Sequence, residues 1–440
     1  MPTPSTAGRA AAPATGEHGL VRALGIVGLA AGIVNITLGG GIFRLPATLS
    51  ASLGAAAPLA YLTTAVAFGI IVLCMADAGS RVSLTGGPYA YIETAFGPFI
   101  GFLSGVVLWL LSTFAMAAVS TVFADNVAAL VPTFGGTLGH TVFYVLLFGT
   151  LAAVNVRGVQ QGARLNTLVT AAKVLPLLLL AFGAWGGVRR EHLVVEHWPD
   201  AGSLARNAII LTFAFSGIES ALVPSGEVKD PARTVPRAIF LAMGSVTVLY
   251  LLLQTVARGV LGPALDTAAT PLAAVAGAAL GDWARTLLLL GASVAMFGHG
   301  GGMMLSLPRV LWALARDGFL PKGLAAVHPT WRTPHVAILV QAGMAAALAA
   351  TSTFERLAIL ANISVLLLYG ACCLAAWQLR RAGVQQGGTP FTVPVPGLLP
   401  WLGVAVIAWM LTSIEPAEWL GVLVALTLAS VVYFLRTRAR

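Results

Sequence analysis

Three consecutive glycines, Gly39, Gly40 and Gly41, interrupt a long apolar segment near the N-terminus. A glycine inside a helix costs about 1 kcal/mol relative to alanine, so the run predicts a break in that helix. At membrane depth, unwound backbone is tolerated only where it lines a cavity. The N–H groups after such a break suit a carboxylate, and the carbonyl groups before it suit an ammonium. The alternative is that the glycines form a face for close helix packing.

A second interruption, at Ser216 and Gly217, lies in a later apolar segment, and a carboxylate, Glu219, follows it. Carboxylates inside a membrane are costly and usually functional, although Glu219 could instead form a structural hydrogen bond between helices. Phe213 and Phe215 could wall the apolar part of a ligand, with Phe215 as a gate, or could be ordinary core residues.

Two further ionisable residues lie inside apolar segments. Lys173 is about eight residues or more from either end of its segment, a depth that favours a buried ammonium; the alternative is a lysine whose ammonium reaches the membrane surface. An ammonium at that depth can release and take up a proton during a reaction cycle. His299 lies among glycines in another segment, where it could line a pathway or form a structural hydrogen bond.

The elements that position these residues must be membrane helices. Hydrophobic residues make up 58% of the 440 residues and charged residues only 9%, whereas soluble domains carry about 25% charged residues. Such a chain cannot cover a water-facing surface of this size, so lipid must surround most of it. The apolar runs predict about twelve transmembrane helices, at residues 24–49, 57–79, 99–122, 142–156, 165–185, 204–223, 238–261, 286–314, 336–350, 357–379, 398–414 and 419–435.

The basic residues predict the orientation of these helices. Of the 25 Lys and Arg residues, seventeen fall on the side of the N-terminus and seven on the other side, with Lys173 inside a span. Cytoplasmic loops carry the excess of Lys and Arg, so both termini are expected in the cytoplasm, with the protein in the plasma membrane. The net charge of +9 is explained in this way, and no basic patch with interleaved aromatic residues indicates nucleic-acid binding.

The two interruptions indicate an internal repeat. Each lies in the first helix of a five-helix block, and consecutive blocks of five helices must have opposite orientation, the pattern of an inverted-repeat transporter. The predicted organisation is a cytoplasmic tail without fixed structure at residues 1–19 and one transmembrane domain at 20–440. That domain divides into a first repeat (20–200), a second repeat (201–385) and the last two helices with a tail (386–440).

Five motifs together resemble the amino acid–polyamine–organocation transporters, over roughly residue 20 to the C-terminus. They are the helix-one glycine motif (39–43), the helix-six motif (215–221), a loop motif at 86–91, the segment after helix six at 227–238 and the segment ending helix eight at 309–321. The resemblance implies an all-α protein with the 5+5 inverted repeat of the leucine-transporter fold, plus two C-terminal helices and alternating access by rocking.

The resemblance also implies roles for particular residues. The α-carboxylate would bind the helix-one glycine amides, and the α-amino group would meet carbonyl groups near Thr37–Leu38 and Phe213–Ser216. Lys173 would occupy the place that sodium takes in sodium-coupled relatives, and it departs from the pattern of the arginine/agmatine-type antiporters. The predicted substrate-binding residues are Thr37, Leu38, Gly39, Gly40, Gly41, Ile42, Phe213, Ala214, Phe215, Ser216, Gly217 and Ile218, with Lys173 and Glu219 for proton coupling and His299 on the pathway.

The leading hypothesis is therefore a sodium-independent secondary transporter of neutral amino acids, which is proton-coupled or exchanges its substrates. The alternative is an antiporter of cationic amino acids or polyamines, with Glu219 reading the cation; a channel or sensor is more remote. No P-loop or metalloprotease motif occurs, which disfavours an ATP-driven pump, and no enzyme activity, cofactor or metal is predicted. The three cysteines lie in apolar runs and imply no disulfide or zinc framework. The oligomeric state is not predicted.

Overall fold

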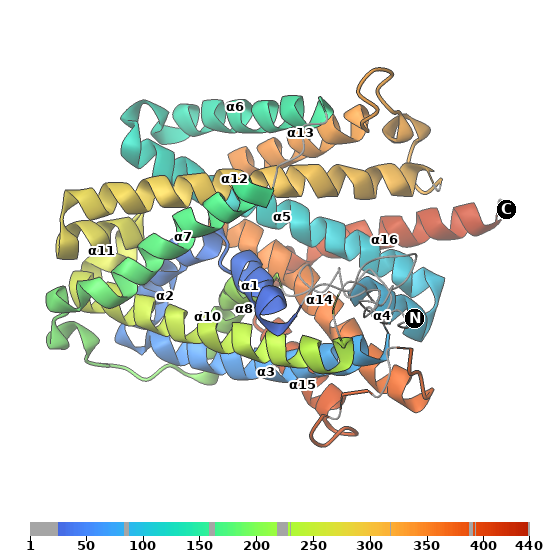
Figure 1. Cartoon of the computed structure of the whole chain (residues 1–440), viewed down its shortest axis with the longest axis horizontal. Helices are drawn as coiled ribbons and strands as arrows, with labels where there is room; N and C mark the ends of the chain where they lie inside the picture. Colours follow the sequence, from blue (N-terminus) through green and yellow to red (C-terminus); the bar gives the residue numbers. More distant parts are fainter. Residues whose placement is uncertain are drawn as a thin grey trace, which may run out of the picture.

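The computed structural model describes residues 25–82, 88–157, 163–217, 228, 230–316, 318–386, 390–391 and 393–438. Helices form its regular structure, and there is no β-strand among these residues. In chain order they are α1 (Ile26–Thr37), α2 (Leu45–Leu53), α3 (Ala57–Arg81), α4 (Pro88–Phe96), α5 (Pro98–Leu130), α6 (Gly136–Val156), α7 (Ala163–Gly183), α8 (Ala201–Phe215), α10 (Pro231–Leu261), α11 (Pro271–Leu280), α12 (Asp282–Arg316), α13 (His335–Thr351), α14 (Phe354–Arg381), α15 (Leu399–Leu411) and α16 (Pro416–Arg438). Figure 1 shows the longer ones running roughly along one axis of the molecule.

Every predicted membrane segment contains helical structure, with ends that differ by a few residues. In the part of the chain described, seven helical segments are long and apolar enough to cross a membrane, and six shorter apolar helices accompany them. The helices α4 and α11 were not predicted, because each has only about ten residues and is too short for a span. The chain is thus a polytopic all-helical membrane protein.

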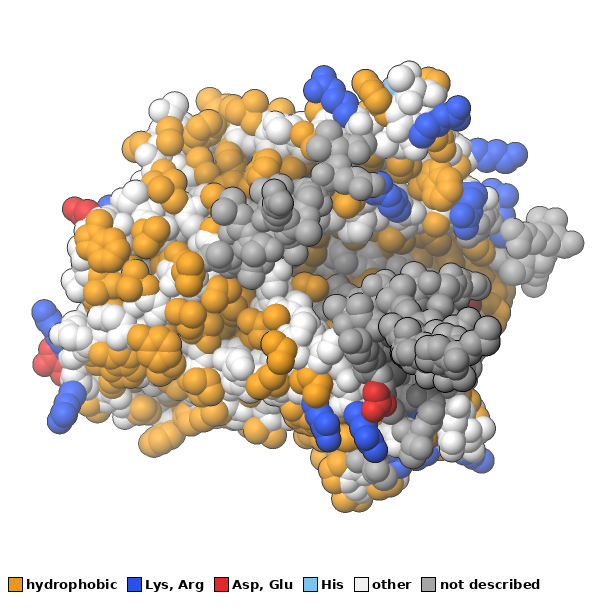
Figure 2. All heavy atoms as spheres, viewed as in Figure 1, with side chains coloured by type: hydrophobic (Ala, Val, Ile, Leu, Met, Phe, Trp, Pro, Cys, Tyr) orange, Lys and Arg blue, Asp and Glu red, His pale blue; other side chains and the backbone are white. Residues whose placement is uncertain are grey.

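The outer surface of the bundle is apolar, as a lipid environment requires. Large hydrophobic side chains are exposed along α6, α7 and α16. Figure 2 shows hydrophobic side chains spread over this face of the bundle, while Lys and Arg lie at its two ends and are more numerous at the end where α16 finishes. In water these side chains would form a large apolar patch, but lipid solvates them.

The helix α14 lies at the centre of the fold. It packs against α5, α3 and α8, and 72% of the residues in its most apolar window are buried, compared with 6% for α16. Both broken segments described below face this inner group of helices: α8 contacts α14 directly, and the turn after α1 contacts α5. The centre of the bundle therefore holds the interrupted helices away from lipid, where their free backbone groups can be tolerated.

Candidate substrate-binding site

The first predicted helix break is present. The helix α1 ends at Thr37, a short 3₁₀ turn covers Gly40–Phe43, and α2 begins at Leu45. Side chains cannot fit at two of the glycines. A Cβ atom on Gly40 would lie 2.8 Å from Val119 Cγ1, and one on Gly41 would lie 2.8 Å from Phe213 Cδ1. The glycine run thus lets unwound backbone approach α5 and α8 closely.

The second predicted break is described on its first side only. The helix α8 ends at Phe215, Ser216 is extended, and Gly217 has a φ of 115°, a conformation that L-residues with side chains rarely adopt. A Cβ atom on Gly217 would lie 2.8 Å from Ile36 Cγ2, so the two breaks are in contact. Ile218 and Glu219 lie outside the described residues.

Tyr250 of α10 joins the two breaks. Its buried hydroxyl oxygen lies 3.1 Å from the carbonyl oxygen of Thr37 and 2.9 Å from that of Ala214. One hydroxyl hydrogen serves both carbonyl groups, which belong to the last turns of the two interrupted helices. The contact provides a donor for the Ala214 carbonyl group near the end of α8, and a second donor for that of Thr37, which also accepts from the backbone N–H of Gly39.

A small cavity of about 60 Å³ lies between the breaks. Its walls come from the end of α1, the glycine run, the end of α8, and the facing helices α5 and α12. It is lined by Ile36, Thr37, Gly39, Gly40, Leu111, Ser112, Ala115, Val119, Phe213, Ser216, Gly217, His299 and Met303. Seven of these were predicted from the sequence, whereas the four residues from α5 were missed because they form part of an unbroken apolar helix with no distinctive pattern.

The remaining predicted residues lie behind the cavity. Leu38, Gly41, Ile42, Ala214 and Phe215 are buried close to it but do not line it.

The structure distinguishes Phe213 from Phe215. The ring of Phe215 packs between Phe68 and Tyr250, with centroid distances of 5.5 Å to each, while Phe213 lines the cavity and packs edge-on against Phe354 at 5.5 Å. Of the two rings, Phe213 lines the cavity and Phe215 does not, and the gating role of Phe215 stays a prediction.

Two polar side chains at this cavity have no partner. Thr37 is only 2% exposed, and its hydroxyl oxygen is buried with no hydrogen bond. His299 also lines the cavity, and no hydrogen bond joins either ring nitrogen to another described residue. Leaving a buried polar group such as the Thr37 hydroxyl unpaired costs about 1–3 kcal/mol, so it is expected where a polar ligand provides the missing hydrogen bond. His299 is half-buried, and its ring nitrogens can bind the same ligand.

Lys173 lies beside the first break. Its ammonium is buried and donates a hydrogen bond to the carbonyl oxygen of Asn35, two residues before the end of α1. The side-chain oxygen of Asn35 is buried and unpartnered. Lys173 also interacts electrostatically with His299 on the adjacent helix α12. A single ammonium is thus close to both the broken helix and the cavity.

A larger cavity of about 450 Å³ lies beyond the partition formed by Phe213 and Phe354. It contains charges of both signs, from Arg44, Asp125, His140 and Glu355. These charges are loosely paired: Arg44 Nη2 lies 3.5 Å from Glu355 Oε1, and His140 Nε2 lies 3.9 Å from Asp125 Oδ1. Arg44 also donates to the carbonyl oxygen of Ala269 at 3.3 Å, which links the start of α2 to the start of α11.

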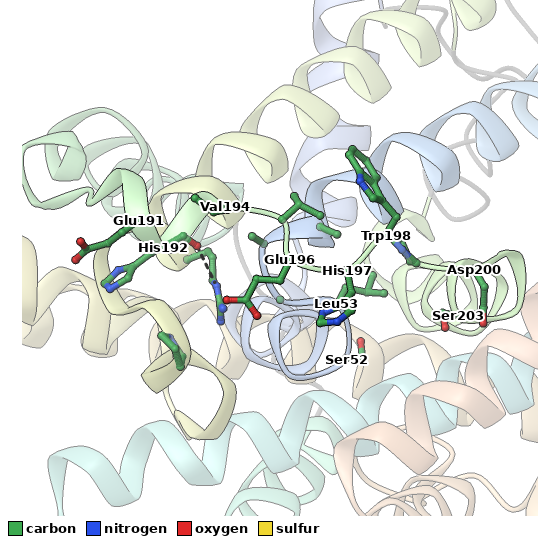
Figure 3. A pocket seen from close by; sticks show the side chains of 17 residues that line it. Ser52, Leu53, Glu191, His192, Val194, Glu196, His197, Trp198, Asp200 and Ser203 are labelled. Atoms are coloured by element: carbon green, nitrogen blue, oxygen red, sulfur yellow. Dashed lines mark hydrogen bonds between the residues drawn. The ribbon is translucent and has the colours of Figure 1, made fainter.

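A third cavity, of about 470 Å³, lies at the ends of α2, α8 and α10 (Figure 3). The connection between α7 and α8 supplies most of its polar side chains, among them Glu196, His197 and Asp200. Asp200 caps α8, and the backbone N–H of Ser203 lowers the pKa of this carboxyl group. None of the predicted substrate-binding residues lines this cavity.

Comparison with known proteins connects this architecture to transport. A family model described as amino acid permease matches residues 24–434. An uncharacterized transporter of Mycobacterium tuberculosis is 31% identical over 88% of this chain and 85% of its own length. A serine/threonine exchanger of Bacillus subtilis is 26% identical over 89% and 90% of the two chains. A branched-chain amino acid permease of the same organism is 26% identical over 97% and 95%.

The match covers both helix breaks, the facing helices α5 and α12, and Lys173. The chain therefore belongs to the amino acid permease family of the amino acid–polyamine–organocation superfamily, and it is a membrane transporter rather than an enzyme.

Proposed function

We propose that this chain is a sodium-independent secondary active transporter that carries small neutral amino acids across the plasma membrane by alternating access, coupled to protons or by exchange. The observation that carries the proposal is the contact between two interrupted helices around a cavity that holds an unpartnered Thr37 hydroxyl. Bare peptide groups at such a place can replace the water that solvates a zwitterion.

Within this proposal, the cavity binds both charged ends of an amino acid. The carboxylate lies against the amides of Gly39–Gly41 and the Thr37 hydroxyl. The ammonium lies against carbonyl groups of Thr37–Leu38 and Phe213–Ser216, and a carbonyl oxygen that accepts one hydrogen bond can accept another through its second lone pair. The Thr37 carbonyl oxygen already accepts from Gly39 and Tyr250, so in this group Leu38 and the end of α8 are the freer acceptors. The four α5 side chains and Met303 then enclose the rest of the molecule.

The proposed topology has twelve spans arranged as an inverted repeat of five plus five helices, followed by two more. In this arrangement α1 and α2 form the first span, and α8 begins the sixth. The division into 20–200, 201–385 and 386–440 follows from it. The higher density of Lys and Arg at the end where α16 finishes supports cytoplasmic termini.

Lys173 provides the proposed coupling. While its ammonium binds the Asn35 carbonyl, α1 is held against α7. Loss of the proton removes the charge that strengthens this hydrogen bond, and the end of α1 becomes easier to move. Asn35 lies just before the cavity, so a proton on Lys173 and a substrate at Gly39–Gly41 both shift the conformational equilibrium of the end of α1. Two sites are coupled when both change the equilibrium of one shared element.

A cationic substrate, the alternative, would need a carboxylate for its side chain. Glu219, the candidate for that carboxylate, lies outside the described residues, while Lys173 places a positive charge close to the cavity. The charge of Lys173 favours a neutral substrate.

Uptake of a radiolabelled neutral amino acid into proteoliposomes tests the proposal. We expect saturable uptake without sodium, competition by neutral amino acids, and a response to an imposed pH gradient or to internal amino acid. Gly40→Val should abolish uptake, while Gly32→Val, where an added Cβ meets nothing within 4 Å, should retain it. Uptake competed only by arginine or agmatine would support the alternative, and flux that does not saturate would indicate a channel.

A further inference from the structure

We infer that the cavity selects small amino acids whose side chain carries a hydroxyl or another neutral hydrogen-bonding group, and that His299 reads this group. The inference rests on the proposed site for the α-carboxylate and α-amino group. It adds a substrate class and a specificity-determining residue to that site.

The position of the backbone-binding groups decides where the substrate side chain points. The glycine run and the end of α8 form one wall of the cavity, and the α5 and α12 helices form the facing wall. If the charged ends of the substrate bind the first wall, its side chain meets Ser112, Ala115, His299 and Met303. These residues therefore form the side-chain subsite.

The volume of the cavity limits the side chain. About 60 Å³ has room for about four to six water-sized groups, which is fewer than the heavy atoms of serine or threonine. The walls must therefore move slightly even for a small amino acid, and a larger side chain requires more movement. Val119 packs tightly against Gly40, and Phe213 packs tightly against Gly41. These two side chains therefore leave little room for the cavity to widen next to the glycine run. Large aromatic and long charged side chains are therefore excluded from this arrangement.

The polarity of the subsite favours a hydrogen-bonding group. His299 has no hydrogen-bond partner among the described residues, and a neutral imidazole offers one donor and one acceptor. Ser112 donates its hydroxyl hydrogen to the carbonyl oxygen of Leu108 at 2.8 Å, which leaves its oxygen lone pairs available. A substrate hydroxyl can donate or accept a hydrogen bond, so it can pair with either ring nitrogen of His299. An apolar side chain of the same shape leaves the imidazole without a hydrogen bond.

The charge near the subsite sets the remaining selectivity. Lys173 interacts electrostatically with His299, so a positively charged side chain would add a second cation in a water-poor space. The described lining residues supply no carboxylate to offset it. Neutral polar side chains avoid this cost.

Threonine and valine provide the matched test, because they differ by one hydroxyl in place of one methyl group. We would measure their competition against radiolabelled alanine uptake in proteoliposomes. Threonine is expected to compete about tenfold or more better than valine, as for sites that hydrogen-bond a substrate hydroxyl. His299→Leu should remove the difference while alanine uptake persists, and His299→Gln should retain part of it. Leu290→Ala, at an exposed position of α12 that does not line the cavity, should leave it unchanged.

The outcomes separate this inference from the proposed function. Absence of any amino acid uptake would contradict the proposed function itself. Alanine uptake with equal competition by threonine and valine, or stronger competition by aspartate, would overturn only the inference. A preference for threonine that persists in both His299 variants would assign the hydroxyl to another residue. The comparison in the unmodified protein decides the substrate class even if a variant fails to fold.

Discussion

Tyr250 donates its hydroxyl hydrogen towards the carbonyl oxygen of Ala214 across 2.9 Å, and the same oxygen lies 3.1 Å from the carbonyl oxygen of Thr37. A side chain on α10 thus spans the ends of two helices that are more than 170 residues apart in the sequence. The distance between the breaks depends on this contact as well as on the glycine contacts.

Tyr250→Phe removes the shared donor and leaves its ring in place. We expect the free energy of unfolding to fall by about 0.5–1.5 kcal/mol, the usual contribution of one hydrogen bond, and the substrate KM to rise. Thermal unfolding in detergent and uptake kinetics measure the two effects. Tyr61→Phe is the control, because its hydroxyl makes only a 3.4 Å contact with Gln254, away from the breaks. Equal KM changes in both variants would contradict the proposed role of Tyr250.

The contact between Gly40 and Val119 predicts a compensating pair. Gly40→Ala places a methyl group 2.8 Å from Val119 Cγ1 and should lower substrate affinity about tenfold, because the backbone of the break must move. Adding Val119→Ala should recover much of the loss. Gly39→Ala is the control, because its Cβ would meet only carbonyl oxygens at 3.8 and 3.9 Å. A double-mutant cycle of ligand-binding affinities measures the coupling, and strictly additive effects would show that the two residues act independently.

Lys173 should carry the pH dependence of transport. Lys173→Ala removes the ammonium that holds the carbonyl group of Asn35, and we expect uptake to become insensitive to an imposed pH gradient. Initial rates at several external pH values measure this. Lys322→Ala removes an exposed cation and should leave the profile unchanged. An unaltered pH profile in Lys173→Ala would remove this lysine from the coupling mechanism.

The ion pair between Arg44 and Glu355 should limit access to the inner part of the larger cavity, next to Phe354. The pair is partly exposed, so it contributes at most about 1 kcal/mol, which corresponds to about a fivefold change in opening. A cysteine at Thr121, a buried position that lines this cavity, reports opening through its rate of labelling by a water-soluble maleimide. Background labelling should be low because Cys74, Cys372 and Cys373 are buried.

Arg44→Gln is expected to speed labelling at position 121 about fivefold, because the link from α2 to α14 and α11 is lost. Arg356→Gln, a neighbouring change on α14, should have little effect. Equal labelling rates with and without Arg44 would show that other contacts hold the cavity closed.

The strongest predictions from the sequence concern residues that are unfavourable in their own segment, such as glycines within a helix or charges within a membrane span. A glycine run and a Ser-Gly pair in apolar segments are poor helix formers, so both breaks were predictable. The first is confirmed, and α8 ends at Phe215, as the second requires. Lys173 and His299 were noticed because ionisable residues are costly in lipid. Their roles in transport stay predictions, and Ile218 and Glu219 lie outside the described residues.

Residues that are common in apolar membrane helices could not be identified in this way. Leu111, Ser112, Ala115 and Val119 belong to an ordinary apolar helix, and only its packing against the breaks places them at the cavity. Tyr250 gave no signal for the same reason.

The two phenylalanines on α8 show what remained undetermined. Two residues apart on a helix are separated by about 200°, so Phe213 and Phe215 point to nearly opposite sides. From the sequence, both rings could wall the apolar part of a ligand, with Phe215 as a gate, or could be ordinary core residues. The rotation of α8 against its neighbours instead turns Phe213 towards the cavity and Phe215 towards Phe68 and Tyr250.

The sequence by itself determined that the chain is embedded in lipid, at which residues two helices are interrupted, and which charged residues lie inside apolar segments. Each of these follows from the free energy of a residue in its own segment. The tertiary structure decided that the breaks meet, that α5 and α12 form the facing wall, and which polar groups are left unpartnered. Those features depend on how helices distant in sequence rotate and pack against one another, and no single segment contains that information.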